Sequence, residues 1–443
     1  MPMMNRLERV AVSLSTAEKE FGAVKIGGHV TQVSTGAIRV SGLSRSVCLG
    51  DLVLIEGQDR ILQGEIILLD ERDVVVKPFE RSSDIGIGAT AWRMGGLAVH
   101  PDPTWKGRVV NALGKPIDNR GPLKTGPAGF LLDRDPPQAM ERARVNKPVR
   151  TGVKVIDLFT PLCVGQRIGI FAGSGVGKST LLGMLAGFGE FDTVVVGLVG
   201  ERGREVREFI DDVLGDALEN SVVVAATGDE SPMMRRLAPK TAMSVAEYFR
   251  GLGHSVLLIV DSATRFAHAA RDVAMAAGEP PVSRGYTPSV FSDLAKLLER
   301  AGPGAEGEGT ITGIFSVLVD GDDHNDPVAD NLRGLLDGHV ILDRGIAEAG
   351  RYPPVDILKS TSRLSQRAWT DDQRELILRL KGMIARFEET RDLRLMGGYQ
   401  SGLDESLDKA CELVPKIYEA LRQSAKPAEA SDPFTDLARA LSV

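Results

Sequence analysis

Cysteines, aromatic residues and long apolar runs are scarce in this chain of 443 residues. Its three cysteines, Cys48, Cys163 and Cys411, lie far apart and lack metal-ligand spacing, which indicates buried thiols in a reducing compartment. No run approaches the roughly 18 apolar residues of a membrane span, and the first residues lack the apolar core of a signal peptide. We therefore expect a cytoplasmic protein.

The composition also indicates which kinds of partner the protein is not expected to bind. Aromatic residues make up 5% of the chain and the formal net charge is -7, which argues against wholesale binding of nucleic acid. The hydrophobic content of 43% and the charged content of 26% are those of a soluble globular protein. The length is sufficient for two or three domains, each with its own core.

A glycine-rich segment is the most informative part of the chain. Residues 171–180 read FAGSGVGKST, after an apolar run at 168–171 and before the apolar helix pattern that starts at Leu181. Strand, glycine loop, Lys-Ser and helix together are the context of a phosphate-binding P-loop, in which backbone N–H groups and the helix N-terminus face an anion. Lys178 would reach the β- and γ-phosphates, and the Ser179 hydroxyl would bind Mg²⁺.

The segment departs from the strict P-loop pattern at one position. The pattern G-x-x-x-x-G-K-[ST] expects glycine at 172, where this chain has Ala172. Alanine is small, and Gly173 and Gly175 keep the loop flexible, so we retain the assignment. The predicted nucleotide-binding residues of the loop are Ala172, Gly173, Ser174, Gly175, Val176, Gly177, Lys178, Ser179 and Thr180.

The patterning predicts several domains. Short β-rich runs separated by turn residues recur within 24–92, as in a small barrel. The segment 94–145 is rich in Gly, Pro and Asp and is interpreted as an irregular linker into the next domain. Strands and helices then alternate to about residue 345, with apolar strands typical of a covered parallel sheet, and the pattern from 370 onward is helical.

Two acidic positions follow apolar strand runs. Asp261 ends VLLIVD, where a carboxylate could meet Mg²⁺ beside the P-loop or could merely cap the next turn. Glu201, with Glu205 as the second candidate, could orient or deprotonate the attacking water, and Arg202 could hold Glu201. The spacing of GERGREVREF fits a solvated charged helix face equally well.

Two further residues are candidates on weaker grounds. Tyr352 precedes two prolines, and a rigid turn can hold an aromatic ring as a stacking plate for a base. Arg363 follows Ser-Thr-Ser and could act as an arginine finger on a γ-phosphate. From spacing alone, ordinary packing for Tyr352 and an ion pair for Arg363 are favoured.

Several motifs in a fixed order carry a resemblance to a known family. They are FAGSGVGKST, GERGREV, VLLIVDSATRFAHAARDV, SVLVDGDDHNDPVADNLRGLLDGHVILDR and RYPPVDILKSTSR. Over residues 24–425 the chain resembles the ATPase family of rotary ATP synthase α and β subunits. Within that family it is most similar to the type III secretion ATPases, and among these to the flagellar export ATPases.

The resemblance implies an α/β fold: a RecA-like P-loop NTPase core with an N-terminal small β-barrel and a C-terminal helical domain. It implies an amphipathic docking helix at 1–23, a barrel at 24–92, an ATPase domain at 93–366 and a helical domain with a mobile tail at 367–443. It also implies a homohexameric ring with nucleotide sites at the subunit interfaces.

The resemblance also implies roles for individual residues of this chain. The resemblance implies that Lys178 and Ser179 bind phosphate and Mg²⁺, that Glu201 activates water and that Asp261 is the second acidic residue at the metal. Arg202 and Arg265 would lie near the γ-phosphate, and Arg363 would be the finger supplied by the adjacent subunit. The base would be bound by Tyr352 and, with less support, Tyr399.

The implied partners are those of a Mg-dependent ATPase that exports protein. The helix at 5–21 would bind a stator-like regulator, and 271–288 would face a ring pore that holds a central-stalk-like component. Export gate, chaperones and protein substrates would complete the apparatus, with the enzyme peripheral at the cytoplasmic face of the inner membrane and no nucleic acid bound.

Four other functions share part of this motif set with flagellar export. A catalytic ATP synthase subunit is disfavoured because its acidic DELSEED-type motif is missing; the nearest string is LDESLD at 403–408. A noncatalytic synthase subunit is disfavoured by the presence of Glu201. The aromatic-poor, mildly acidic barrel argues against a Rho-type RNA translocase. A virulence-type secretion ATPase shares every catalytic motif, and only the termini favour the flagellar assignment.

Overall fold

The computed structural model describes residues 25–34, 36–80, 84–319, 326–425 and 432–442. The chain divides into two compact units at the junction of Leu97 and Ala98. The predicted docking helix at 5–21 lies outside the described residues. Within the described ranges, no helix combines the length and the apolar character that crossing a membrane requires.

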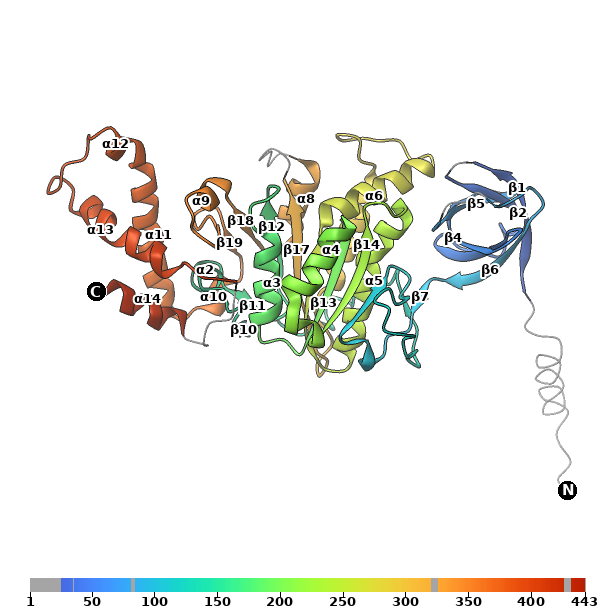
Figure 1. Ribbon diagram of the computed structural model, residues 1–443, viewed down its shortest axis with the longest axis horizontal. Coiled ribbons are helices and arrows are strands. Elements are labelled where there is room, and N and C mark those ends of the chain that lie inside the picture. The colour runs from blue at the N-terminus through green and yellow to red at the C-terminus, as the bar shows by residue number, and fades with distance from the viewer. Residues whose placement is uncertain (1–24, 35, 81–83, 320–325, 426–431, 443) are drawn as a thin grey trace, which may run out of the picture. The chain divides into compact units, whose positions relative to one another are not determined.

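The first unit contains a closed antiparallel barrel with the strand order β1-β2-β5-β4-β3-β6 (Figure 1). Buried and partly exposed residues alternate along β2, β3 and β5, because successive side chains of a strand point to opposite faces. Most of the buried positions in these three strands are valine and isoleucine, and they belong to the barrel core. The strands are β1 (Gly27–Val33), β2 (Ile38–Ser41), β3 (Asp51–Glu56), β4 (Ile61–Leu69), β5 (Asp73–Pro78) and β6 (Thr90–Gly96).

The second unit is built on a nine-stranded sheet with the order β19-β18-β12-β17-β15-β13-β14-β8, and β16 pairs with β17 off this path. The strands from β18 to β8 in this order run parallel, whereas β19 and β16 pair antiparallel. The members are β8 (Arg108–Asn111), β12 (Arg167–Ala172), β13 (Thr193–Glu201), β14 (Ser221–Thr227), β15 (Ser255–Asp261), β16 (Gly302–Pro303), β17 (Thr310–Leu318), β18 (Gly338–Leu342) and β19 (Thr361–Ser362).

The segment interpreted as an irregular linker contributes to this sheet. β8 pairs in parallel with β14, with Arg108 opposite Val222, and forms one edge of the sheet. The prediction for 94–145 was wrong at this point because the flanking glycines and prolines obscured a four-residue strand with only two apolar residues, Val109 and Val110. Short pairs flank the sheet, namely β7 (Ala98–Val99) with β9 (Phe130–Leu131) and β10 (Pro148–Val149) with β11 (Leu162–Cys163).

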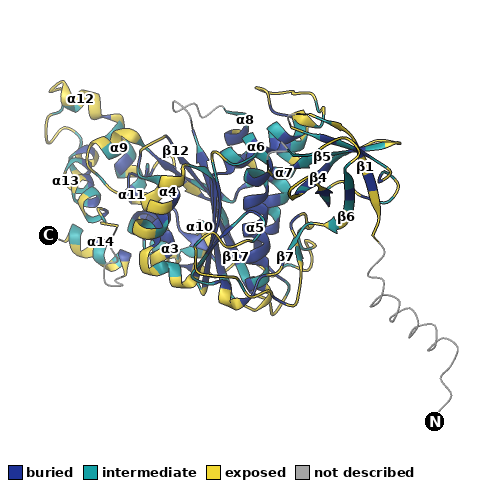
Figure 2. Cartoon of the chain, turned by 45° about the vertical axis from the view of Figure 1, so that its right-hand side comes forward, coloured by how far each residue is buried: buried dark blue, intermediate teal, exposed yellow. Residues whose placement is uncertain are grey.

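Helices cover both faces of the sheet. Figure 2 shows the buried strands between α3 and α4 on one side and α5, α6 and α7 on the other. This is the layering expected for apolar parallel strands. The helices of this region are α2 (Lys154–Phe159), α3 (Lys178–Phe188), α4 (Gly203–Glu208), α5 (Pro232–Gly251), α6 (Ala263–Ala276), α7 (Pro288–Arg300), α8 (Pro327–Leu335) and α9 (Arg344–Glu348). The short turns are η1 (Pro103–Trp105), η2 (Phe209–Leu214) and η3 (Gly215–Asn220).

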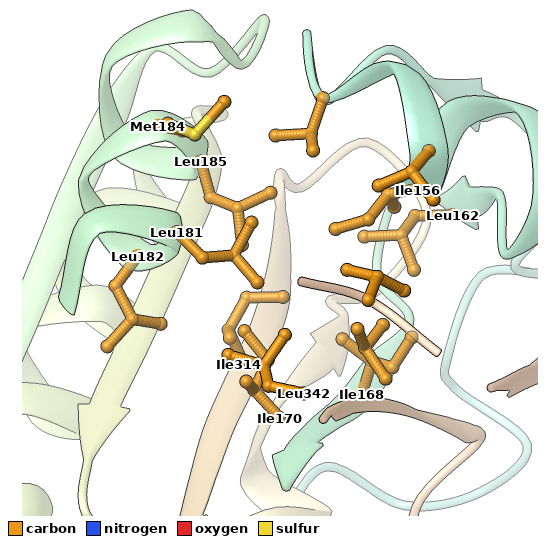
Figure 3. Packing of buried hydrophobic residues seen from close by; sticks show 14 of the residues in the cluster. Ile156, Leu162, Ile168, Ile170, Leu181, Leu182, Met184, Leu185, Ile314 and Leu342 are labelled. Atoms are coloured by element: carbon orange, nitrogen blue, oxygen red, sulfur yellow. The ribbon is translucent and has the colours of Figure 1, made fainter. Parts of the chain in front are cut away.

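The helix that follows the P-loop is held by apolar packing. Leu181 and Leu185 of α3 lie in one buried cluster with Ile168 and Ile170 of β12 and with Ile314 of β17 (Figure 3). Full burial of each such side chain contributes about 1.5–3 kcal/mol. The end of β12 and the start of α3 are therefore fixed relative to each other, which fixes the loop between them.

The C-terminal region is helical. Ile377, Leu380 and Ile384 of α11 are buried, and Val414 and Ile417 of α13 belong to the same core cluster. The helices are α10 (Ser365–Ala368), α11 (Asp371–Glu389), α12 (Arg391–Leu395), α13 (Glu405–Ala420) and α14 (Pro433–Leu441). Together, the barrel, the α/β core and these helices confirm the predicted fold class.

Candidate functional site

The P-loop joins β12 to α3 and has the backbone conformation that its glycines allow. Gly175 and Gly177 have φ values of +77° and +97°, which side-chain-bearing residues rarely adopt. Gly177 is also the N-cap of α3, so Lys178 begins the helix. Ala172 ends β12, is buried, and is not among the described residues with positive φ, which explains why alanine is tolerated there.

Lys178 joins the two carboxylates predicted from the sequence. Its Nζ hydrogen bonds to Asp261 Oδ1 and lies 3.8 Å from Glu201 Oε1. Asp261 ends β15 and Glu201 ends β13, and the carboxyl ends of parallel strands meet at one edge of a sheet. All three side chains are largely buried, with exposed fractions of 11% for Lys178, 3% for Asp261 and 13% for Glu201.

A β-bulge directs Glu201 into this site. The register between β13 and β14 shifts between Val199 and Glu201, and Gly200 has a φ of +68°. A bulge re-aims the side chain that follows it, and such bulges are common next to active sites. Arg265 of α6 then holds Glu201, with Nη1 2.6 Å from Oε1.

The surroundings favour the protonated form of Glu201. Burial raises the pKa of its carboxyl above the ordinary glutamate value, and Asp261 and Glu205 act in the same direction. Arg265 and Lys178 oppose this shift. The hydrogen bond with Glu201 lowers the pKa of Glu205 below the ordinary glutamate value. A carboxyl with a raised pKa at a strand end is typical of general acid–base catalysts.

The oxygen donors fit Mg²⁺. Ser179 presents an exposed hydroxyl in the first turn of α3, and Asp261 adds a carboxylate. Hydroxyl and carboxylate oxygens are ligands that Mg²⁺ accepts, usually together with waters and nucleotide phosphates. Among the described residues, no three His, Cys, Asp or Glu side chains gather into a metal-holding group, so the ion would depend on the phosphates for its other ligands.

Tyr352 lies beside the P-loop. A Cβ atom placed on Gly177 would be 3.8 Å from Tyr352 Cε1. The residue is 49% exposed, which leaves surface for a base to stack on. The carbonyl of Tyr352 accepts a hydrogen bond from the Gln423 N–H at 2.9 Å, which ties it to the segment after α13.

Arg363 lies at the opposite end of the sheet. Its N–H donates to Asp337 O at 2.8 Å, and the Asp337 N–H donates to the carbonyl of Arg167, the first residue of β12. The P-loop follows Ala172, the last residue of that strand, and a rise of about 3.3 Å per residue puts the two strand ends roughly 16 Å apart. The exposed side chain of Arg363 points to Arg333 O at 3.2 Å. It therefore does not reach the P-loop of its own chain.

Two other candidates are engaged elsewhere. The guanidinium of Arg202 is 79% exposed and lies 3.6 Å from Glu205 at the start of α4. The hydroxyl of Tyr399 donates to Asp408 of α13 at 2.5 Å, which raises the pKa of Tyr399 to about 12. The structure thus brings neither residue to the P-loop, and their roles stay predictions.

Two residues near the site were missed by the sequence reasoning. Arg344, directly after β18, donates to the P-loop carbonyl of Ser174 at 3.2 Å. Ser316 of β17 donates to Asp261 Oδ1 at 2.6 Å. The available signals were a charged residue shortly after a mostly apolar strand and a hydroxyl between two apolar neighbours.

A cavity of about 960 Å³ is lined by residues other than the P-loop, Glu201 and Asp261. Its walls come from the chain around α9 and from α11, α12 and α13, and its described lining contains no P-loop residue. The loop and the charged cluster, rather than this cavity, therefore mark the candidate phosphate site.

Comparison with known proteins shows which family the chain resembles. A family model described as "ATP synthase alpha/beta family, nucleotide-binding domain" matches residues 152–362, and one described as "T3SS EscN ATPase C-terminal domain" matches 369–442. The chain is 56% identical over 425 residues to a flagellum-specific ATP synthase of Agrobacterium fabrum, covering 96% of this chain and 90% of that protein. It is 40% identical over 422 residues to a type 3 secretion system ATPase of Xanthomonas euvesicatoria, covering 92% and 93%.

Two solved structures share the fold of this chain over most of its length. The assembled ATPase EscN from the type III secretion system of enteropathogenic E. coli matches with a TM-score of 0.87 and 36% identity, covering 94% of this chain and all of that chain. EscN in complex with its central stalk EscO matches with a TM-score of 0.84, 35% identity and the same coverage.

Proposed function

The chain belongs to the ATP synthase alpha/beta family, in its branch of flagellar and type III secretion ATPases, and from this we propose that it is the ATP hydrolase of a flagellar protein-export apparatus. The observation that carries the activity is the placement of Lys178 between Asp261 and Glu201 beside a P-loop. Within the chain we propose a barrel domain at 24–92, an ATPase domain at 93–366 and a helical domain at 367–443.

The P-loop and Tyr352 would bind ATP. The N–H groups of residues 172–180 and the N-terminus of α3 would surround the phosphates, and Lys178 would contact the β- and γ-phosphates. The Tyr352 ring, beside Gly177, would stack on adenine. Tyr399 would join the base pocket only if the segment around it moves, since its hydroxyl now contacts Asp408.

Mg²⁺ would be held by Ser179 and Asp261 together with the phosphates. The ion, when bound, would neutralise charge on the phosphate oxygens. Lys178 contacts Asp261 directly, so its ammonium would be shared between that carboxylate and the nucleotide.

Glu201 would act as the base in hydrolysis. A water attacks the γ-phosphorus, the bond to the β,γ-bridging oxygen breaks to release ADP and phosphate, and Glu201 accepts the proton of the water. Arg265 fixes the carboxylate for this step. Arg363 of one subunit would stabilise the transition state at its neighbour's P-loop, because it does not reach its own. Arg202, exposed at the start of α4, would act near the γ-phosphate or contact the next subunit.

The assembly would be a homohexameric ring. Support comes from the assembled EscN structures, one of which contains a central stalk. We propose a stalk-like component in the pore near 271–288 and a stator-like regulator on the N-terminal helix. The export gate, chaperones and protein substrates would be further partners, with peripheral contact at the inner membrane from the cytoplasm.

Purified protein and its Lys178→Ala variant test the ATPase assignment. We expect Mg²⁺-dependent phosphate release from ATP by the wild type and a loss of at least a hundredfold in the variant. Export is tested by replacing the chromosomal gene with the variant and measuring hook and filament protein in the culture medium. Normal export by cells that carry Lys178→Ala would refute the flagellar role.

A virulence-type secretion ATPase is the second candidate. It is supported by the match to the Xanthomonas protein and by the EscN structures. Loss of needle-complex protein secretion in the Lys178→Ala strain, with motility intact, would favour this alternative.

A further inference from the structure

A buried hydroxyl in the central sheet is directed at the Asp261 carboxylate. Ser316 lies in β17 with 0% of its surface exposed, and its Oγ donates to Asp261 Oδ1 at 2.6 Å. β17 lies between β12 and β15, with Ile170 opposite Ser316 and Val260 opposite Phe315. The register therefore places Ser316 next to Asp261 and level with the strand that enters the P-loop.

The residues on either side of Ser316 in this strand are apolar. Phe315 and Val317 are fully buried neighbours, and a hydroxyl in such a place is costly unless it is hydrogen bonded. A bond to a carboxylate is stronger than one between neutral groups. Lys178 uses the same oxygen, so both donors hold Asp261 through Oδ1.

We propose that Ser316 is a positioning residue for the metal site. It fixes the Asp261 carboxylate through Oδ1 and so keeps Oδ2 available to the Mg²⁺ that accompanies the nucleotide. This inference rests on the proposed metal role of Asp261. Ser316 itself would contact neither the nucleotide nor the metal, and it would act only through Asp261.

The test uses the full-length protein and Ser316→Ala. We measure the affinity for a fluorescent ADP analogue in excess Mg²⁺ and in EDTA, and the Mg²⁺ concentration that half-saturates hydrolysis. Loss of a hydrogen bond to a charged group should weaken Mg²⁺-dependent binding and raise the half-saturating Mg²⁺ concentration about tenfold. Affinity in EDTA should not change, because the P-loop is intact. Ser316→Thr keeps the hydroxyl and should retain wild-type values.

Thr312→Val is the matched control. Thr312 lies on the same strand, is fully buried, and accepts the Gly165 N–H at 2.9 Å at the other end of the sheet. The Thr312→Val substitution removes one buried hydroxyl that does not contact Asp261, so the half-saturating Mg²⁺ concentration should equal that of the wild type. An equal rise of the half-saturating Mg²⁺ concentration in Thr312→Val and Ser316→Ala would overturn the proposal. The absence of any rise in Ser316→Ala would overturn it as well. If Ser316→Ala does not fold, Ser316→Cys supplies only a weak donor of similar size and should show the same rise.

Asp261→Asn separates this inference from the proposed function. If Asp261→Asn raises the Mg²⁺ requirement and Ser316→Ala does not, only the role of Ser316 fails. If Asp261→Asn has no effect either, the metal role of Asp261 fails as well. In the Asp261→Asn background, Ser316→Ala should add nothing, because both changes act on one interaction. Full additivity of the two effects would also refute the proposal.

Discussion

At the scale of single residues, the site depends on how a buried carboxylate is surrounded. Glu201 has two cations and two carboxyl groups as neighbours, and burial adds to the effect of the carboxyl groups on its pKa. Its ion pair with Arg265 fixes its orientation. A group held in this way is placed to accept a proton without contributing to nucleotide affinity.

Replacing Glu201 with Gln should therefore separate binding from turnover. The amide keeps the size of the side chain but cannot accept the proton of the water, so steady-state hydrolysis should fall by about 10²–10⁴-fold. Nucleotide affinity, measured by equilibrium binding, should stay within about twofold of the wild type. Glu205→Gln is the matched change at the second candidate and should retain most of the activity. Near-normal turnover by Glu201→Gln would remove it from the catalytic role.

The raised pKa of Glu201 predicts the acidic side of the pH–rate profile. The base must be deprotonated, and a raised pKa keeps it protonated to higher pH, so activity should rise with pH at values above the ordinary glutamate pKa of about 4.3. Arg265 lowers this pKa, and Arg265→Gln should therefore move the midpoint of the rise to higher pH. An acid limb at or below the ordinary value, or a shift to lower pH in the variant, would contradict the assignment.

At the scale of elements, parallel strands that end at one edge of the sheet bring the site together. Lys178 follows β12, Glu201 ends β13 and Asp261 ends β15, and each position is fixed by strand register and by helices packed on both faces. The helices on the α5 face are themselves joined by buried charge. Arg300 of α7 pairs with Glu247 of α5 at 2.9 Å, and both side chains are 2% exposed.

Breaking that pair should destabilise the second unit. Arg300→Met leaves Glu247 uncompensated in the interior and removes a bond to Leu132 O, so the free energy of unfolding should fall by about 3–5 kcal/mol. Denaturant unfolding monitored by circular dichroism measures the change. Arg207→Ala, which removes an ion pair on the exposed face of α4, should have little effect. Equal stability of Arg300→Met and wild type would show that the pair does not support the core.

At the scale of the whole molecule, a single chain does not bring all the proposed catalytic residues together. Arg363 is separated from its own P-loop by the length of β12, whereas Lys178, Glu201 and Asp261 lie together. If Arg363 is the finger, it must act across an interface between subunits. Two measurements test this requirement.

Mixing of inactive variants tests action in trans. Arg363→Ala and Lys178→Ala should each lose hydrolysis, since finger contacts contribute roughly 10³–10⁵ in rate. Mixed rings contain interfaces with an intact P-loop on one side and an intact Arg363 on the other, so the mixture should regain part of the activity. Co-assembly is verified by pull-down of tagged subunits. Absence of recovery in verified mixed rings would refute the trans assignment.

Dependence on concentration tests assembly itself. Specific ATPase activity should rise steeply with protein concentration as rings form, because a single chain holds half of the proposed site. Light scattering over the same range should show the increase in mass. A constant specific activity over a wide concentration range, with monomer present throughout, would contradict a requirement for the ring.

The sequence reasoning succeeded where a pattern is local. The P-loop spacing, the apolar strands that end at Glu201 and Asp261, and the short β-rich runs of the barrel all correspond to elements of the structure. It failed for β8, a short strand among glycines and prolines, because only its pairing with β14 identifies it as part of the sheet. Ser316 and Arg344 were also missed, since their partners are more than fifty residues away in the chain.

The sequence by itself determined that a loop with P-loop spacing leads into a helix, that carboxylates end two apolar strand runs and that the chain resembles the export ATPases. These features depend on residues close to one another in the chain, where spacing is sufficient evidence. Only the tertiary structure decided that Lys178 contacts Asp261 and lies near Glu201, that Tyr352 lies beside Gly177, and that Arg363 is distant from its own P-loop. Strand order and register are set by contacts between distant segments, and a single sequence does not show them.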